Sequence, residues 1–319
     1  MNKKSRTDST ILFLVTAASW ILLLGNLLVR NLQAKAKTPL LEVVKIGGDI
    51  YLAKGEWGSN VGFYVANNEV LAIDSKATAK ATEKVIKEFA KIIQSPITRV
   101  AFTHSDPDSF NGREAYPDRA GVICSLGLTK DNFRYFGFFL EMNAPLEIYN
   151  TESWPTSEFV PAITFDGQLS LRIGQKEVQF IHYGPAHTRG DAIIFFPEER
   201  VAFIGDLVFI GHDPIIQSDK GGSCYGLIRV LSVLLSLKPE IRTFIPSHAD
   251  PIGRDEVQKA LKFVEGVTSK VESMFHAGKT MEDVKKEFGV PAPPNESGTW
   301  VPPNFAASVY HELAESKIK

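Results

Sequence analysis

Cysteine is scarce in this chain: two cysteines, Cys124 and Cys224, occur among 319 residues. Two cysteines are too few for a disulfide framework, and neither stands in a Cys-x-x-Cys or Cys/His metal-binding spacing. We expect both to be small buried hydrophobic residues, with a single bridge between them as the alternative. The sequence therefore gives no reason to assign a function to either cysteine.

An excess of charge of one sign is also missing. Lysine and arginine together number 35 and aspartate and glutamate 37, which gives a formal net charge of −2 at pH 7. The sequence contains no block of basic residues and no RNA-binding aromatic motif. Because nucleic-acid binding depends on a basic surface, we expect no nucleic acid partner.

Long hydrophobic runs are missing as well, except near the amino terminus. Residues 11–29 are almost uninterrupted in their apolar character, and they follow Lys3, Lys4 and Arg6. This order is typical of a signal sequence, although the run approaches the length that spans a bilayer. We therefore expect residues 1–36 to be either a cleaved signal sequence or an N-terminal membrane anchor. Both alternatives predict an exported protein, periplasmic or extracellular, or one anchored with its domain outside the cytoplasm.

The rest of the chain alternates short strands with helices. Apolar runs over residues 41–73 are separated by glycine and asparagine turns, and an amphipathic helix is expected over residues 78–93. The second half repeats this order from residue 164, with helices expected over residues 225–236 and 254–277. Strands followed by a helix, twice, predict an α/β four-layer αββα sandwich, with two mixed sheets face to face and helices outside.

Length and composition indicate how this region divides. After the amino-terminal segment roughly 280 residues remain, which is consistent with one large α/β domain. We expect that domain over residues 41–280. Residues 281–319 contain a proline- and glycine-rich stretch between two helix-like segments, and we expect them to form an extension packed on the domain. A further helix is expected over residues 130–141.

Histidine and aspartate gather at the ends of predicted strands. The β-branched run over residues 97–102 is followed by His104, Asp106 and Asp108 at every second position. In an extended backbone alternate residues project to one side, so an imidazole and two carboxylates can converge there. A solvated turn is the alternative for this loop taken alone. Three later strand ends carry further histidines and aspartates: residues 184–191, 204–206 and 245–248.

These four segments resemble the motifs of the metallo-β-lactamase superfamily of metal-dependent hydrolases. The family pattern is T-H-x-H-x-D-H, then G-x-x-H-T-x-G, then G-D, then P-x-H, and the chain carries the four blocks in this order. The resemblance runs over residues 43–276 and implies the αββα fold. Two positions depart from the usual pattern. Asp106 stands where the family has its second histidine, and Ser109 stands where it has the last histidine of the first block.

The resemblance implies six metal-ligand positions: His104, Asp106, Asp108, His187, Asp206 and His248. The first metal would take His104, Asp106 and His187, and the second would take Asp108 and His248. The carboxylate of Asp206 would bridge the two ions. Asp108 would also be the catalytic residue, because its family counterpart orients the attacking water and accepts a proton.

The cofactor that the resemblance implies is Zn²⁺, as one or two ions. Replacing an imidazole by the carboxylate of Asp106 makes the first site richer in oxygen and more anionic, so Fe²⁺ or Mn²⁺ can compete there. We also expect a less acidic metal-bound water. Because the hydroxyl of Ser109 is a poorer ligand than imidazole, we expect one tightly held ion and a second that is loose or absent.

Residues flanking the motifs are expected to play smaller roles. Three are expected to support the site: Asp74, Thr188 and Asp191. For Asp74 a turn-capping role is the alternative. His212 and Asp213 follow the strand that ends at Asp206 and could reach a substrate. His182 lies on a strand face and is expected to be structural, whereas His276 and His311 lie on predicted helices at the surface.

The leading functional hypothesis is a metal-dependent hydrolase that uses a metal-activated water on a small-molecule ester, lactone, lactam, thioester or phosphoester. A noncatalytic binding protein of the same fold is one alternative, which Ser109 favours. An iron-dependent sulfur dioxygenase of the same fold is another. The membrane would be a further partner only if the amino-terminal segment stays uncleaved.

Overall fold

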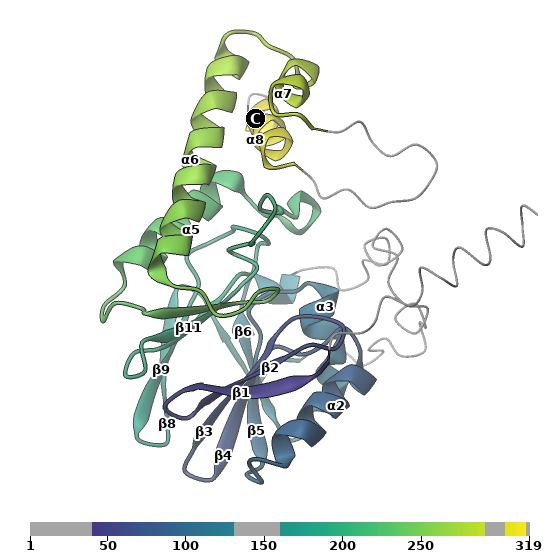
Figure 1. The fold of residues 1–319 in the computed structure, drawn as a ribbon, viewed down its shortest axis with the longest axis vertical. Helices are drawn as coiled ribbons and strands as arrows, with labels where there is room; N and C mark the ends of the chain where they lie inside the picture. Colours follow the sequence, from purple (N-terminus) through teal and green to yellow (C-terminus); the bar gives the residue numbers. More distant parts are fainter. Residues whose placement is uncertain (1–39, 131–159, 291–303, 317–319) are drawn as a thin grey trace, which may run out of the picture.

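Two β-sheets form the centre of the computed structural model, which describes residues 40–130, 160–290 and 304–316 (Figure 1). The first sheet has seven strands in chain order: β1 (Glu42–Gly47), β2 (Ile50–Lys54), β3 (Val61–Ala66), β4 (Glu69–Ile73), β5 (Ile97–Ala101), β6 (Gly121–Ser125) and β7 (Ile163–Phe165). Strands β1 to β4 pair antiparallel, whereas β4 to β7 pair parallel, so the sheet is mixed.

The second sheet is also mixed. Its five strands lie in the order β12 (Thr243–Pro246), β11 (Val201–Gly205), β10 (Ile193–Phe196), β9 (Lys176–Ile181) and β8 (Gln168–Ile173). Strands β8 to β11 are antiparallel neighbours, and β11 and β12 are parallel. Strand β5 of the first sheet and strands β11 and β12 of the second each end at a predicted histidine or aspartate cluster.

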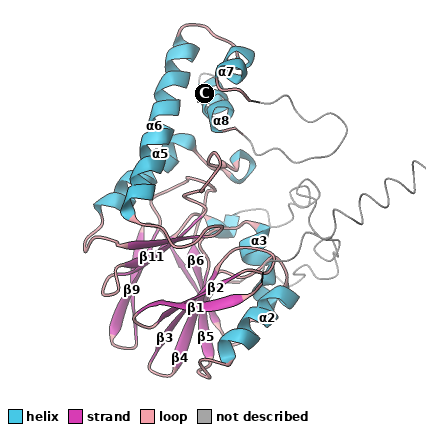
Figure 2. Cartoon of the chain, viewed as in Figure 1, coloured by secondary structure: helices cyan, strands magenta, loops and turns pink. Residues whose placement is uncertain are grey.

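Helices cover the outer faces of both sheets (Figure 2). The described α-helices are α2 (Ala79–Ala90), α3 (Pro107–Phe110), α5 (Cys224–Ser236), α6 (Arg254–His276), α7 (Met281–Glu287) and α8 (Phe305–Ser316). Phe89 of α2 stacks on Phe63 of β3, with ring centroids 4.0 Å apart. On the other side, apolar residues of α5 and α6 share a buried cluster with the second sheet.

A separate hydrophobic core fills the space between the sheets. Tyr64 of β3 packs against Phe196 of β10 with ring centroids 4.9 Å apart, and Phe196 in turn contacts Phe203. All three rings are almost completely buried. Burial on this scale is the main favourable contribution to folding. The layers therefore run helix, sheet, sheet, helix, and the predicted αββα sandwich is confirmed.

Local sequence explains where helix α2 begins. The hydroxyl of Thr78 accepts a hydrogen bond from the Ala81 backbone N–H, which caps the first turn. Ala81, Val85 and Phe89 then form the buried stripe against the first sheet. The helix ends at Ala90, three residues before the predicted end at residue 93, and Ile92 is exposed. The apolar pattern beyond Ala90 therefore predicted a helix that is three residues too long.

Helices α7 and α8 lie beside the far end of α6, which extends beyond the sandwich (Figure 1). Val284 of α7 and Val309 of α8 are buried in the same apolar cluster as Val271 of α6. These contacts bring the carboxyl-terminal helices onto the long helix. The helix predicted over residues 130–141 falls almost entirely outside the described residues, as does the amino-terminal segment.

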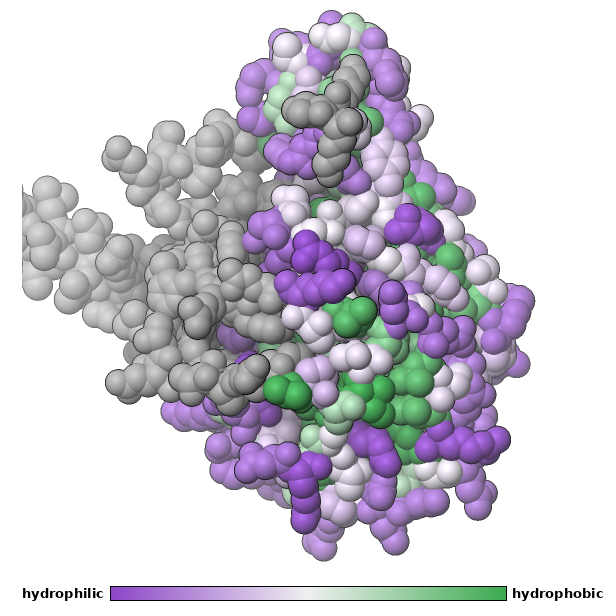
Figure 3. Space-filling model, turned by 180° about the vertical axis from the view of Figure 1, so that it is seen from behind, coloured by the Kyte–Doolittle hydropathy of each residue, from purple (hydrophilic) through white to green (hydrophobic). Residues whose placement is uncertain are grey.

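Both cysteines are buried and free, as expected for two small hydrophobic residues, and the bridge given as the alternative is not formed. Within the described ranges no helix combines the length and apolar character that a membrane span requires. Seen from behind, hydrophobic residues gather at the level of the sheets, whereas the projecting helical end is mostly hydrophilic (Figure 3).

Candidate metal centre

The loop after β5 carries the first group of polar side chains. His104 and Asp106 follow the strand, and Asp106 precedes helix α3 with an extended backbone at φ −66° and ψ 139°. The helix begins at Pro107, a residue type favoured at the first helical position. Asp108 therefore lies in a helical turn, and the expectation of extended backbone through Asp108 is wrong.

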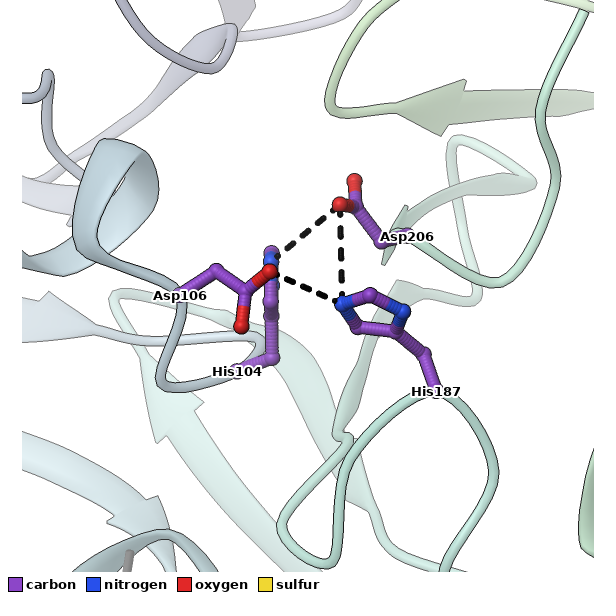
Figure 4. A group of neighbouring side chains, drawn as sticks. All are labelled: His104, Asp106, His187 and Asp206. Carbon is purple, nitrogen blue, oxygen red and sulfur yellow. Dashed lines mark hydrogen bonds and ion pairs between the residues drawn. The ribbon is translucent and has the colours of Figure 1, made fainter. Parts of the chain in front are cut away.

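Three imidazoles converge on one carboxylate oxygen. Oδ2 of Asp206 lies 3.6 Å from Nε2 of His104, 3.7 Å from Nε2 of His187 and 3.5 Å from Nε2 of His248. Figure 4 shows His104, His187 and Asp206 turned toward one another, with Asp106 beside them. Asp106 Oδ2 lies 3.1 Å from His187 Nε2. Four of these side chains, His104, Asp106, His187 and Asp206, place ligand atoms within 4.8 Å of one another.

A hydrogen-bonded chain holds His104 in place. Asp74 accepts hydrogen bonds from the Thr103 backbone N–H and from the Thr103 hydroxyl, at 2.7 and 2.8 Å. Nδ1 of His104 lies 2.8 Å from the same hydroxyl, which leaves Nε2 directed at the cluster. Asp74 itself has a positive φ of 60°, a strained conformation for a residue other than glycine. The supporting role expected for Asp74 fits this geometry.

His187 is oriented by the backbone around it. Its Nδ1–H donates to the Ile215 carbonyl at 2.8 Å, which leaves Nε2 as the nitrogen facing the cluster. The turn that follows is closed by Asp191, which accepts hydrogen bonds from the Thr188 backbone N–H and hydroxyl. The expected bracing of this turn by Thr188 and Asp191 is therefore present.

Gly205 allows the second sheet to approach His104. Its φ is +55°, and a Cβ at this position would lie 2.8 Å from the Thr103 hydroxyl and 3.2 Å from His104 Nδ1. A side chain would therefore be strained and would also push against the residues that orient His104. The glycine of the Gly205–Asp206 pair is what permits Asp206 to reach the imidazoles.

Asp108 and His248 form a second, more exposed group. Oδ2 of Asp108 lies 3.1 Å from Nε2 of His248. The His248 side chain is 38% exposed, compared with 1% for His104 and His187. Oδ1 of Asp108 is buried and makes no hydrogen bond to any residue that the structure describes. An unpartnered buried carboxylate oxygen is costly unless a cation or a water contacts it.

Ser109 does not join this second group. Its hydroxyl is hydrogen-bonded to the Ser59 hydroxyl and lies 3.4 Å from His104 Nε2. It therefore faces the buried first group. The position at which the family has another histidine supplies no ligand beside Asp108 and His248, and the incomplete second site stays a prediction.

Two residues that the motifs did not reveal contact Asp106. Nζ of Lys220 donates to Asp106 Oδ1 at 2.7 Å, and Nε2 of Gln217 donates to Oδ2 at 3.2 Å. Both lie in the loop after β11 that ends in the short 3-10 helix η5 (Ser218–Lys220). The first site is therefore less anionic than the sequence predicted, because a buried ammonium offsets the extra carboxylate.

Electrostatics within the cluster favour bound positive charge. Burial alone would lower the pKa of His104, but the carboxylate of Asp206 raises it to about 10. Burial would likewise lower the pKa values of His187 and His248, but neighbouring carboxylates raise both. Burial would raise the pKa of Asp206, yet His248 and His104 hold it well below its usual range. Carboxylates that favour protons on three imidazoles also favour a divalent cation among them.

The donor set fits a metal ion. Tetrahedral coordination with bonds of about 2.1 Å separates ligand atoms by about 3.4 Å. The contacts of Asp206 Oδ2 with the imidazoles and of Asp106 Oδ2 with His187 span 3.1–3.7 Å. Two imidazoles with fixed Nδ1 partners and two carboxylates are ligands that suit Zn²⁺, Fe²⁺ or Mn²⁺. The structure brings all six predicted positions together, and their role as ligands stays a prediction.

The other predicted residues lie away from the cluster. His182 is buried, and its Nδ1–H donates to the Asp191 carbonyl, as expected for a structural histidine. Asp213 accepts hydrogen bonds from Asn304 and Phe305 near the start of α8, and His212 is exposed. The sequence instead missed Phe209, whose ring stacks on His248 at 6.4 Å.

An apolar surface cavity opens beside this stacked pair. Its volume is about 420 Å³, and its lining comes from residues 208–214 and from one face of α6. Ile210 and Phe263 in this lining are 50% and 43% exposed. The cavity therefore places an apolar surface next to Phe209, which stacks on His248 of the second group.

Comparison with known proteins relates the site to one family. The family model described as the metallo-beta-lactamase superfamily matches residues 55–248, which contain all six candidate ligands. A linear primary-alkylsulfatase of Pseudomonas sp. is 24% identical in an alignment of 224 residues that covers 60% of this chain and 42% of the relative. Metallo-beta-lactamase type 2 of Elizabethkingia meningoseptica is 22% identical in an alignment of 186 residues that covers 55% of this chain and 65% of the relative. The chain thus spans less than two thirds of either relative.

A solved structure shares the fold. The stereoselective inverting sec-alkylsulfatase Pisa1 from Pseudomonas sp. has a TM-score of 0.67 at 14% sequence identity. The alignment covers 86% of this chain and 50% of that protein. At this identity the likeness concerns the fold.

Proposed function

Because the chain belongs to the metallo-beta-lactamase superfamily, we propose that it is a metal-dependent hydrolase whose cation lies among His104, Asp106, His187 and Asp206. One observation carries the proposal. Oδ2 of Asp206 has three imidazole Nε2 atoms at 3.5–3.7 Å, and the Nδ1 atoms of His104 and His187 have oxygen partners. Because their Nδ1 atoms have these partners, His104 and His187 present their Nε2 lone pairs to Asp206.

When bound, a divalent cation supplies Lewis acidity and lowers the pKa of water to about 7, so that a nucleophile forms at neutral pH. Asp108 is positioned to accept the proton of the attacking water. Its Oδ2 contacts His248, and its Oδ1 has no partner among the described residues. We assign Oδ1 as the atom that orients the attacking water and accepts its proton. His248 fixes the plane of this carboxylate.

Within this class we propose an ester with an apolar portion as the substrate. The cavity lined by Ile210 and Phe263 adjoins Phe209, which stacks on His248. An alkyl group seated there would lie against Phe209, whose stacked partner His248 contacts Asp108. The name of one relative, linear primary-alkylsulfatase, supports sulfuric esters as the first to test. Water would add its hydroxyl to the ester's acid group and its proton to the alcohol.

A panel of substrates tests both the metal-dependent hydrolysis and the preference for an ester with an apolar portion. The purified full chain would be stripped of metal, reloaded with Zn²⁺, Mn²⁺ or Fe²⁺, and assayed with alkyl sulfates, carboxylic esters, a chromogenic lactam and a phosphodiester. We expect metal-dependent turnover that rises with alkyl chain length. His104→Ala should abolish it, whereas His311→Ala, at an exposed histidine of α8, should not.

Other outcomes would favour the alternatives. Stoichiometric metal without turnover of any substrate would favour a noncatalytic binding protein. Oxygen consumption with a persulfide would indicate a sulfur dioxygenase. Turnover restricted to the lactam would retain the hydrolase proposal and contradict the ester substrate.

A further inference from the structure

A buried lysine contacts Asp106, one of the two residues that depart from the family pattern. Nζ of Lys220 donates to Asp106 Oδ1 at 2.7 Å, and both side chains are 3% exposed. The same nitrogen lies 3.4 Å from the Ser105 carbonyl. A buried ammonium is unfavourable unless a counter-charge and hydrogen bonds compensate it, and here Asp106 supplies the charge.

The loop that carries Lys220 also shapes the site around His187. The Gln217 N–H donates to the His187 carbonyl at 2.8 Å, and the Arg189 N–H donates to the Lys220 carbonyl at 2.9 Å. Gly222 packs so closely on this turn that a Cβ would lie 2.3 Å from the His187 carbonyl oxygen. The ammonium is therefore positioned by the same backbone contacts that position a candidate ligand.

The two oxygens of Asp106 have different neighbours. Lys220 contacts Oδ1, whereas Oδ2 lies 3.1 Å from His187 Nε2 and 3.2 Å from Gln217 Nε2. Only Oδ2 contacts another candidate ligand. Asp106 thus offers the cluster one oxygen, as an imidazole would offer one nitrogen.

Charge leads to the same interpretation. An imidazole at position 106 would leave Asp108 and Asp206 as the carboxylates of the cluster. Asp106 adds a third, and Lys220 offsets it at hydrogen-bonding distance. The pair has the net charge of the neutral side chain that it replaces.

We propose that Asp106 and Lys220 act as one unit that replaces an imidazole, with Lys220 as a positioning residue that keeps Asp106 a one-oxygen, charge-compensated ligand. The inference rests on the proposed metal-dependent function. It predicts that Lys220 limits how many oxygens the first site offers. Releasing Oδ1 would allow two-oxygen coordination, which suits Mn²⁺ better than Zn²⁺.

Metal competition in a double-mutant cycle tests this inference without an activity assay. Dissociation constants for Zn²⁺ and Mn²⁺ would be measured by chelator competition for four proteins: the wild type, Lys220→Met, Asp106→His and the double variant. Lys91→Met removes a surface ion pair with Glu88 and serves as the matched control. Thermal unfolding of each protein in chelator establishes that it is folded.

Three results are expected. Lys220→Met should shift the preference toward Mn²⁺ over Zn²⁺ by about tenfold or more, within the range typical of changes to groups that hold a ligand. Asp106→His should weaken both metals by about tenfold or more, because it removes the carboxylate that compensates the Lys220 ammonium and leaves that charge beside an imidazole. The double variant should return to within about threefold of the wild type.

Opposite results would overturn the inference. An unchanged Mn²⁺/Zn²⁺ preference in Lys220→Met would show that Oδ1 is not withheld from the metal, and this variant decides the question even if Asp106→His fails to fold. A double variant no better than Asp106→His would show that the pair is not equivalent to an imidazole. Failure of the wild type to bind either metal would instead remove the proposed function itself.

Discussion

The carboxylate of Asp74 accepts two hydrogen bonds from Thr103, at 2.7 and 2.8 Å, and thereby fixes the hydroxyl that orients His104. We expect Thr103→Val to weaken metal binding by about 10- to 100-fold, because the imidazole loses its orienting partner. Chelator competition would measure the loss. Thr103→Ser keeps the hydroxyl and should stay close to the wild type; a Ser variant as weak as Val would contradict the role of the hydroxyl.

Gly205 offers a test of local strain. Gly205→Ala would place a Cβ 2.8 Å from the Thr103 hydroxyl at a φ of +55°, and we expect it to lower the free energy of unfolding by roughly 1–3 kcal/mol. Gly266→Ala is the matched control in helix α6, where a Cβ would meet no atom within 4 Å. It should raise the free energy of unfolding by about 0.5–1 kcal/mol. Equal effects of the two substitutions in chemical denaturation would argue against strain at Gly205.

Lys220 should also matter for stability in chelator. Lys220→Met leaves Asp106 buried without its cation, and breaking a buried pair in this way costs about 3–5 kcal/mol. A saturating divalent cation would give Asp106 a new partner, so the loss should shrink when metal is present. Denaturant unfolding with and without metal measures both values. A loss of the same size in the two conditions would place Asp106 outside the metal site.

Stability without metal should fall as pH rises above neutrality. The pKa of His104 is raised to about 10 in the folded chain, against about 6.5 when unfolded. The folded chain therefore binds this proton more tightly, and the stabilisation is fully present below about pH 6.5 and disappears as pH rises toward 10. The raised pKa values of His187 and His248 act in the same direction.

A bound metal should reverse this dependence. Metal binding requires deprotonated imidazoles, so affinity should rise with pH over the same interval. Thermal unfolding at pH 6.5, 7.5 and 8.5, with chelator and with metal, isolates the cluster because groups elsewhere contribute equally to both series. A gap between the series that does not widen with pH would contradict the proposed cation position.

The two metal positions should differ in occupancy. The His248 side chain is 38% exposed and the first group is almost fully buried, and Ser109 supplies no ligand to the second group. We expect one metal equivalent to survive dialysis and a second to be lost. Elemental analysis would measure this, and His248→Ala should retain the firmly held ion. Two equivalents held firmly by the wild type would refute the asymmetry.

Periodicity was enough to predict the layers of the fold. The meeting of the six polar positions came from the resemblance of the strand-end motifs to the metallo-β-lactamase superfamily, because local rules bring parallel strand ends together within one sheet and these residues come from two sheets. Asp108 was placed in the wrong backbone conformation, since Pro107 is compatible with an extended loop and with the start of a helix.

Lys220 could not have been predicted by the same rules. It lies 114 residues beyond Asp106 in a loop without periodicity, and its contact depends on how that loop closes over His187. A lysine next to two glycines ordinarily indicates an exposed turn. Buried charge pairing of this kind is a tertiary property.

The cluster draws its members from both sheets: His104 and Asp106 follow β5, whereas Asp206 and His248 follow β11 and β12. An ion coordinated by all of them would tie the two halves of the sandwich together at one rim. Removing it should loosen both halves together, and amide hydrogen exchange would then quicken in β5 and β11 at once. The protection of these strands from hydrogen exchange would therefore depend on the cation concentration around the protein.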